Sequence, residues 1–148
     1  MTSPKTDVVL IEDNPNDAEL ALRSLRNYVP RDRLLLLEDG AKALDYFFGP
    51  LGGASGHVPL PKVVLLDLKL PKVSGFEVLG QLKSDERTRI VPVVVISSSS
   101  EERDIRESYR LGANSYLVKP VGFDEYASVL TEVGRYWGVL NRSVESKS

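Results

Sequence analysis

The chain has 148 residues, 42% of them hydrophobic, which fits one domain large enough to bury its own core. Nineteen basic against twenty-one acidic side chains leave a formal net charge of −2. This balance lacks the basic excess that nucleic-acid binding requires, so we expect no nucleic-acid partner. The absence of cysteine excludes disulfides and thiolate metal sites.

Membrane insertion and export are also not expected. No stretch approaches the roughly eighteen apolar residues of a membrane span, and the first residues, Met1 to Lys5, carry no apolar segment of an export signal. The sequence therefore predicts a protein without a membrane partner, located in the cytoplasm.

The first half of the chain alternates short apolar runs with segments of helical spacing. Val8 to Ile11 has the pattern of a strand buried on both faces of a parallel sheet. Pro15 to Asn27 reads as the first helix, with proline in its first turn. Leu34 to Leu37 is the second strand, and apolar residues from Ala43 to Phe48 recur as in a second helix.

An insertion rich in helix and strand breakers interrupts the alternation. Gly49 to Pro61 contains four glycines and three prolines, which predicts an exposed and mobile loop. The sole histidine, His57, lies in this loop. We expect it to be solvated and assign it no role.

The alternation resumes after the insertion. The expected strands are residues 63–66, 91–96 and 115–118, and the expected helices are residues 75–83, 101–111 and 122–141. Gly112 suits the left-handed cap that closes the helix before it. The folded core then covers about residues 6–141, and residues 142–148 form a flexible tail.

Five strands alternating with five helices predict one α/β domain. Right-handed crossovers would place helices on both faces of a doubly wound, five-stranded parallel sheet. We expect the flavodoxin-like strand order 2-1-3-4-5. In such sheets the functional residues lie just beyond the carboxyl ends of the strands.

Charged and hydroxyl side chains follow four of the five expected strands. Glu12 and Asp13 follow the first strand, Asp67 the third, Ser97 the fourth and Lys119 the fifth. Because the first and third strands are neighbours in this order, three carboxylates would meet at one edge and repel one another. The sequence therefore predicts a bound cation at this edge.

The residue types favour Mg²⁺ and phosphoryl transfer. Mg²⁺ prefers oxygen ligands from one or two carboxylates together with waters and phosphate oxygens. With the ion bound, Asp67 could attack phosphorus as a nucleophile. Lys119 and Ser97 could then donate to the phosphoryl oxygens.

Four motifs in order resemble the receiver domains of bacterial two-component response regulators, the chemotaxis-regulator-like fold. The motifs are Ile11-Glu12-Asp13, Leu65-Leu66-Asp67-Leu68-Lys69-Leu70-Pro71 with Gly75 beyond, Val95-Ile96-Ser97, and Tyr116-Leu117-Val118-Lys119-Pro120. The resemblance covers nearly the whole chain. It implies a phosphoacceptor signalling protein with only self-catalysed phosphorylation and slow autodephosphorylation, rather than an enzyme.

The resemblance also implies a role for each motif residue. Asp67 would be the phosphorylated aspartate, Lys119 would contact the phosphoryl group, and Glu12 and Asp13 would hold Mg²⁺ together with the backbone carbonyl of Lys69.

Two motif positions would report the phosphorylation state. Ser97 would be the switch hydroxyl and Tyr116 the switch aromatic, and the Lys119–Pro120 peptide bond would be cis. The chain departs from many relatives at Leu70, where methionine is common, and at Lys69, which places a cation at the mouth of the site.

A narrower resemblance is to the single-domain regulators of bacterial and cyanobacterial phytochrome kinases. This resemblance rests on three segments: the Gly/Pro-rich insertion, Leu111-Gly112-Ala113-Asn114-Ser115-Tyr116 and Tyr136-Trp137-Gly138-Val139-Leu140-Asn141. This implies a sensor histidine kinase of phytochrome type as the partner, without an attached output domain.

Other interpretations of the same residues remain open. Asp67 could cap a turn, Glu12 and Asp13 could favour the dipole of the first helix, and Lys119 could be an ordinary surface lysine. Tyr116 could be a half-buried strand aromatic. Rival functions are a flavodoxin-like electron carrier, an aspartate-nucleophile phosphatase, and a pseudo-receiver that docks a partner without phosphorylation.

The last helix carries an apolar stripe with heptad-like spacing. Its members are Phe123, Tyr126, Leu130, Val133, Trp137 and Leu140. The first half must cover the sheet, whereas Tyr136, Trp137 and Leu140 extend past the expected body. We expect these three to form a homodimer interface, with folding back on the same domain as the alternative.

Overall fold

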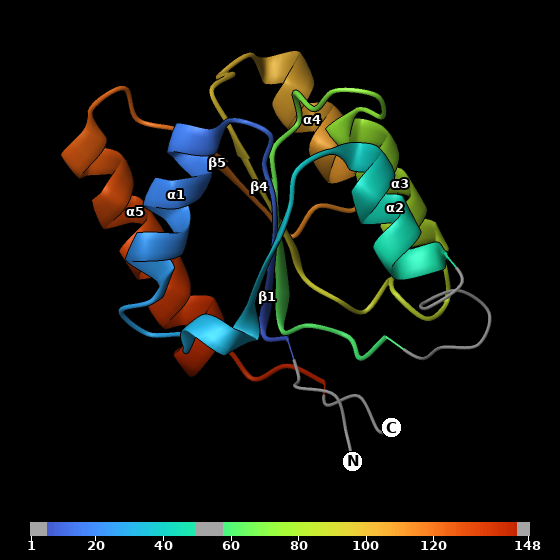
Figure 1. Cartoon of the computed structure of the whole chain (residues 1–148). Helices are drawn as coiled ribbons and strands as arrows, with labels where there is room; N and C mark the ends of the chain where they lie inside the picture. The colour runs from blue at the N-terminus through green and yellow to red at the C-terminus, as the bar shows by residue number, and fades with distance from the viewer. Residues whose placement is uncertain (1–5, 50–57, 145–148) are drawn as a thin grey trace.

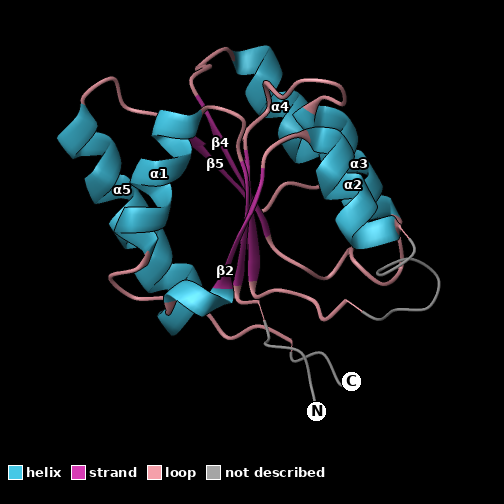
Figure 2. Ribbon diagram, in the orientation of Figure 1, coloured by secondary structure: helices cyan, strands magenta, loops and turns pink. Residues whose placement is uncertain are grey.

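The apolar runs form a central parallel sheet in the computed structural model, which describes residues 6–49 and 58–144 (Figures 1 and 2). The strands are β1 (Val8–Ile11), β2 (Leu34–Leu37), β3 (Val63–Leu66), β4 (Val93–Ser97) and β5 (Ser115–Val118). Their spatial order is β2-β1-β3-β4-β5. This confirms the expected fold class and strand order.

Five α-helices enclose the sheet. They are α1 (Pro15–Leu25), α2 (Gly40–Phe48), α3 (Gly75–Ser84), α4 (Glu102–Arg110) and α5 (Phe123–Arg135), with a 3₁₀ turn at Arg31–Arg33 and a π-helical turn at Tyr136–Leu140. Figure 1 shows α1 and α5 on one face of the sheet and α2, α3 and α4 on the other. In the described part of the chain, no helix combines the length and apolarity needed to cross a bilayer.

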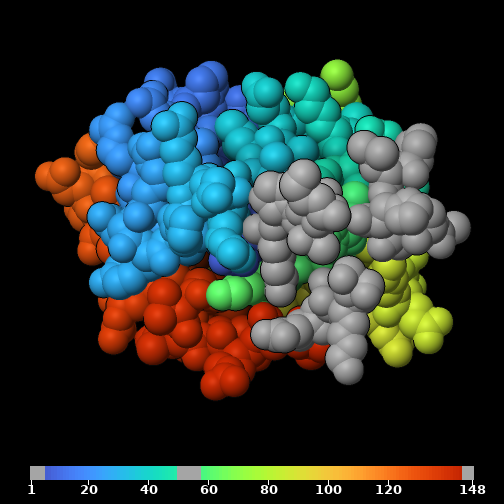
Figure 3. Space-filling model, turned by 60° about the horizontal axis from the view of Figure 1, so that its bottom comes forward, coloured from blue at the N-terminus to red at the C-terminus, as the bar shows by residue number. Residues whose placement is uncertain are grey.

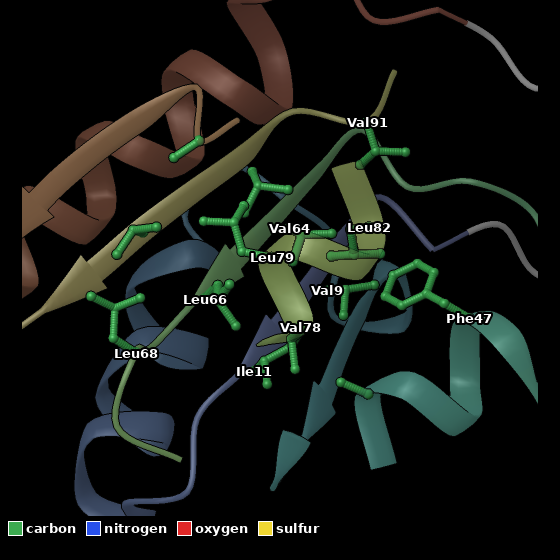
Figure 4. Packing of buried hydrophobic residues seen from close by; sticks show 14 residues of the cluster. Val9, Ile11, Phe47, Val64, Leu66, Leu68, Val78, Leu79, Leu82 and Val91 are labelled. Atoms are coloured by element: carbon green, nitrogen blue, oxygen red, sulfur yellow. The ribbon is translucent and has the colours of Figure 1, made fainter. Parts of the chain in front are cut away.

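The period-two alternation of side chains along each strand divides the core into two halves. Val9, Ile11, Val64 and Leu66 point to the side of α2 and α3, where they meet Phe47 and other apolar side chains (Figure 4). The intervening residues of the same strands point to α1 and α5. Burial on both faces explains why the strand runs are apolar without alternation.

The strand register brings the acidic residues to one level. Ile11 on β1 pairs with Leu66 on β3, so the residues that follow them leave adjacent strands at the same height. In the next two strands of the sheet, Ser97 on β4 pairs with Val118 on β5. The carboxyl edge of the sheet thus collects the predicted site residues.

Two local signals in the sequence produce the expected helix ends. The Asn14 side chain caps α1 by accepting hydrogen bonds from the backbone N–H groups of Asn16 and Asp17, at 2.9 and 3.0 Å. After α4, Gly112 has a φ of 109°, a conformation that glycine adopts without the strain of a Cβ.

The end of the chain differs from the single long helix expected over residues 122–141. The α-helix ends at Arg135, and the Asn141 N–H then donates to the Tyr136 carbonyl, 2.6 Å away, as in a π-helical turn. The Lys62 ammonium donates to the Gly138 carbonyl at 3.1 Å. The Lys62 contact holds the C-terminal turn against its own domain, beside the segment that follows α1 (Figure 3).

Two further expectations concern loops. Most of the insertion at Gly49 to Pro61, including His57, lies outside the described residues, so its predicted mobility stays a prediction. The same is true of the tail beyond Val144.

The expected cis bond before Pro120 is wrong, because the Lys119–Pro120 peptide bond is trans. The Lys119 side chain reaches Asp67 with the bond in the trans form.

Candidate functional site

Three carboxylates gather at the carboxyl edge of the sheet. Glu12 and Asp13 follow β1 and Asp67 follows β3, and one oxygen from each lies within 4.8 Å of the others. Glu12 and Asp67 are buried, at 3% and 8% exposure, whereas Asp13 faces solvent. Buried carboxylates at this spacing repel one another unless a cation lies among them.

The carboxylate cluster fits a hard divalent cation. All three donors are carboxylate oxygens, the ligand type that Mg²⁺ and Mn²⁺ accept, and the exposed Asp13 leaves the cluster open to solvent. The Lys69 backbone N–H donates to Asp67 Oδ1 at 3.1 Å, which fixes the start of the loop after β3. The predicted ligand role of the Lys69 carbonyl stays a prediction.

Lys119 provides positive charge beside two members of the cluster, Glu12 and Asp67. Its Nζ atom donates to Glu12 Oε1 at 2.7 Å and to Asp67 Oδ2 at 2.9 Å. A third hydrogen bond, also 2.9 Å long, reaches Asp17 Oδ2. The structure therefore excludes an ordinary surface role for Lys119, because all three donor positions of its ammonium group face carboxylates.

The surroundings shift the pKa values of the paired groups. Burial raises the pKa of Glu12 to about 7, and the nearby Asp67 charge adds to this, although the hydrogen bond from Lys119 acts in the opposite direction. Burial alone would lower the pKa of Lys119, but its hydrogen bonds to Glu12, Asp67 and Asp17 outweigh that effect and raise it. The ammonium group therefore stays charged at neutral pH.

An aromatic ring completes the surroundings of the ammonium group. Tyr126 on α5 places its ring centroid 6.0 Å from Lys119 Nζ, at the outer limit of a cation–π attraction. Burial raises the pKa of Tyr126 above its ordinary value. The ring thus remains a neutral wall of the site.

Asp17 is the site residue that sequence reasoning missed. It lies in the first turn of α1 rather than directly after a strand, so the rule that searches strand ends passes over it. The capping signal at Asn14 indicates only the general position, because a capped helix that begins four residues after the end of β1 must place its first turn at the same edge of the sheet.

A close backbone approach holds the loop that carries Asp67. A Cβ atom on Gly75 would lie 2.4 Å from the Asp67 carbonyl oxygen and 2.5 Å from Leu68 Cα. The Gly75 N–H donates to the Leu68 carbonyl at 2.9 Å. Only glycine fits this contact, which explains why glycine stands at this position of the motif.

The two expected switch residues lie on neighbouring strands. Ser97 is fully buried, and its hydroxyl oxygen accepts a hydrogen bond from the Ser99 N–H at 3.1 Å. Its carbonyl accepts from the Lys119 N–H at 2.8 Å. Tyr116 is half-buried and donates its hydroxyl to the Ser99 carbonyl at 2.8 Å. The same loop after β4 therefore contacts both switch residues.

The expected interface residues occupy different surroundings. Trp137 packs in part against the core beneath α1 and α5 of its own domain, whereas Tyr136 and Leu140 are about half exposed. A Cβ on Gly138 would lie 2.7 Å from a methyl group of Val29. Close packing of this turn on its own domain therefore leaves only part of the predicted stripe free.

Known proteins match this chain over most of its length. A family model described as "Response regulator receiver domain" matches residues 8–131. The "Probable methanogenesis regulatory protein FilR2" of Methanothrix harundinacea is 43% identical over 92% of this chain and 86% of its own. Response regulator Rcp1 of Synechocystis is 31% identical over 92% of this chain and 91% of its own.

Solved structures agree in fold over the same span. The Mn²⁺-bound form of response regulator Rcp1 aligns with a TM-score of 0.84 at 30% identity, covering 95% of this chain and 99% of that one. The phosphorylated cyanobacterial phytochrome response regulator RcpA has the same TM-score and coverage at 31% identity.

Proposed function

The chain belongs to the response regulator receiver family, and from that premise we propose that it accepts a phosphoryl group from a sensor histidine kinase onto Asp67. The reaction is Mg²⁺-dependent and takes place in the cytoplasm, and the signal leaves through a change of the domain surface. The observation that carries the proposal is the contact of Lys119 with Asp67 at the edge of the Glu12 and Asp13 cluster.

The transfer is a displacement at phosphorus. A carboxylate oxygen of Asp67 forms a bond to phosphorus, the bond from phosphorus to the kinase imidazole nitrogen breaks, and that nitrogen keeps the electron pair and takes up a proton. Lys119 donates to a phosphoryl oxygen and stabilises its charge. A cation held by Glu12, Asp13 and Asp67 would neutralise the charge of the attacking and incoming groups.

Acetyl phosphate provides a test that needs no kinase. Incubation with acetyl phosphate and Mg²⁺ should add one phosphoryl group, seen by intact mass, and chelation of the metal should prevent it. A pseudo-receiver would stay unmodified, and a flavodoxin-like carrier would instead show flavin absorbance. Turnover of a generic phosphomonoester would indicate the phosphatase, which the place of Lys69 two residues after Asp67 disfavours.

We propose a phytochrome-type kinase as the partner. Its support is the likeness to RcpA, described as a phytochrome response regulator. Bacteriophytochrome response regulator AtBRR is a further match, with 40% identity and a TM-score of 0.68. Phosphotransfer from such a kinase to this chain should follow the illumination state of the kinase. Equal phosphotransfer rates from an unrelated histidine kinase would contradict a specific pairing with a phytochrome-type kinase.

The metal site leads to a prediction for Asp13. The Asp13→Ala variant should bind Mg²⁺ about tenfold or more weakly than the wild type, since one carboxylate ligand is lost. Asp13 is exposed, so its loss should not unfold the protein. Isothermal titration calorimetry measures the affinity, and the exposed Asp124 of α5 provides a control, Asp124→Asn. Equal affinities of Asp13→Ala and this control would contradict the site.

The loop after β4 leads to a prediction for the switch. Beryllofluoride on Asp67 stands in for the phosphoryl group. With it bound, we expect the Ser97 hydroxyl to leave the Ser99 N–H and turn toward that group. The hydrogen bond from the Tyr116 hydroxyl to the Ser99 carbonyl should break at the same time. A crystal structure that retains both contacts, now 3.1 and 2.8 Å long, would reject the coupling.

We also propose a homodimer through the C-terminal turn. Tyr136, Val139 and Leu140 are large apolar side chains about half exposed on one short segment, and exposed apolar groups of this size often mark an interface. The Trp137 side chain anchors this segment to the domain core. A two-fold arrangement would present two Asp67 sites together.

Light scattering tests the dimer with a matched pair of variants. Leu140 and Ile90 are both 50% exposed, but Ile90 lies far along the chain, between α3 and β4. The double variant Tyr136→Ser with Leu140→Lys should be monomeric and still accept phosphate, whereas Ile90→Lys should stay dimeric. If the wild type is monomeric at micromolar concentration, both phosphorylated and unphosphorylated, the proposed dimer is wrong.

A further inference from the structure

The ammonium group of Lys119 has one carboxylate partner outside the metal cluster. Glu12 and Asp67 belong to the three residues whose oxygens could hold a cation, and Asp17 does not. Yet Asp17 Oδ2 lies as close to Nζ as Asp67 Oδ2 does, at 2.9 Å. Two of the three carboxylates that Lys119 contacts, Glu12 and Asp67, are therefore also candidate metal ligands, whereas the third, Asp17, is not.

A short hydrogen-bonded loop fixes the position of Asp17. Its backbone N–H donates to Asn14 Oδ1 at 3.0 Å, and the Asn14 backbone N–H donates to Glu12 Oε2 at 3.1 Å. The helix behind it is anchored by the fully buried Leu25. The Asp17 carboxylate is thus carried on a rigid element and is 34% exposed, so its removal opens no cavity.

Lysine and metal compete for the same oxygens. A divalent cation at Glu12 and Asp67 would weaken the hold of these carboxylates on the ammonium group, because both cations need the same lone pairs. A lysine with no other partner would either block the metal or leave the site. The bond to Asp17 avoids both outcomes, since it does not depend on the metal ligands.

We propose that Asp17 is a positioning residue that holds the Lys119 ammonium beside Asp67 while a divalent cation occupies the carboxylate cluster. This inference rests on the proposed phosphoacceptor function and deepens it. Without Asp17, the ammonium group would depend on Glu12 and Asp67 alone and would compete more strongly with the metal. Both Mg²⁺ affinity and the rate of phosphorylation would fall.

A charge-matched pair of variants separates position from bulk charge. Asp17→Asn and Glu19→Gln each remove one negative charge from α1, but Glu19 is exposed and pairs with Arg23 on the helix surface. We expect Asp17→Asn to weaken Mg²⁺ binding and slow uptake from acetyl phosphate, each by about tenfold. For Glu19→Gln, solvent screening should keep both changes within roughly twofold. Equal effects of the two variants would overturn the proposal.

A double-mutant cycle then tests whether Asp17 acts through Lys119. In a Lys119→Met background, Asp17→Asn should change Mg²⁺ affinity no more than Glu19→Gln does, because the interaction that it breaks is already lost. A purely structural role would persist in both backgrounds. If Asp17→Asn still weakened Mg²⁺ binding by about tenfold in the Lys119→Met background, the positioning role would be rejected.

The wild type provides a readout that does not need the variants to fold. Nitrogen-15 NMR detects lysine ammonium groups whose exchange with water is slowed by hydrogen bonding. We expect the Lys119 signal to stay protected when Mg²⁺ is added, and loss of protection would reject the Asp17 contact. Failure of the wild type to bind Mg²⁺ or accept phosphate would instead reject the proposed function, so the two failures are distinguishable.

Discussion

Asparagine in place of Asp67 should abolish phosphorylation by acetyl phosphate and by a kinase. The amide is nearly the same size as the carboxylate, so the fold should survive, but its oxygen and nitrogen are too weak as nucleophiles to displace a phosphoryl group. Both carboxylate oxygens are already oriented, one by the Lys69 N–H and one by Lys119. Intact-mass measurement should show no added phosphoryl group.

The control for this prediction is another aspartate away from the site. Asp124 lies exposed in the first turn of α5, and Asp124→Asn should accept one phosphoryl group as the wild type does. Residual labelling of Asp67→Asn at wild-type stoichiometry would mean that another group accepts the phosphoryl group. Partial labelling at a new position, mapped by peptide fragmentation, would show a secondary acceptor.

The sheet and its acidic edge could be predicted from sequence because both depend on local patterns. A strand buried on both faces must be apolar throughout, and Val63–Leu66 is apolar and buried at every position. Once the strand order is known, parallel register places the residues after β1 and β3 together. Glu12 and Asp67 are therefore fixed by topology rather than by details of packing.

Asp17 and the C-terminal turn could not be predicted in the same way. The position of Asp17 depends on the rotation of α1 about its axis, which is set by Asn14 and by packing on α5. The stripe through Trp137 and Leu140 shows which face of the helix is apolar but not which surface covers it. Contacts from Lys62 and Val29 decide that question, and both residues are remote in sequence.

The trans bond before Pro120 shows the limit of a family resemblance. The resemblance predicts a cis isomer that would direct Lys119 into the site, yet the trans chain places Nζ within 2.9 Å of three carboxylates. The pull of these carboxylates on a long, flexible side chain is enough to direct it. The contacts of Lys119 therefore follow from charge rather than from the isomer of this peptide bond.

Methionine in place of Lys119 should have the second large effect, with opposite signs for stability and metal binding. The metal-free protein should lose stability, because buried Glu12 and Asp67 no longer have a counter-charge. Removal of one partner from a buried pair costs about 3–5 kcal/mol. The loss here should lie below that range, since burial already raises the pKa of Glu12 to about 7 and the carboxyl can take up a proton.

Metal should restore much of this loss in the variant. Without the ammonium group, Mg²⁺ no longer competes for Glu12 and Asp67, so its binding should tighten and its stabilising effect should exceed that in the wild type. Phosphorylation by acetyl phosphate should nevertheless slow by about a hundredfold, because a donor to the phosphoryl oxygens is missing. Thermal unfolding with and without Mg²⁺, together with the phosphorylation rate, measures all three quantities.

A lysine on the surface provides the control for Lys119→Met. Lys42, in the first turn of α2, pairs at 3.5 Å with the exposed Glu38 that precedes the helix, and Lys42→Met removes the same charge without touching the site. It should leave Mg²⁺ affinity and the phosphorylation rate near wild-type values. If Lys119→Met weakened Mg²⁺ binding instead, the ammonium group would not be competing with the cation. Lys119 would then be a structural support of the ligand carboxylates.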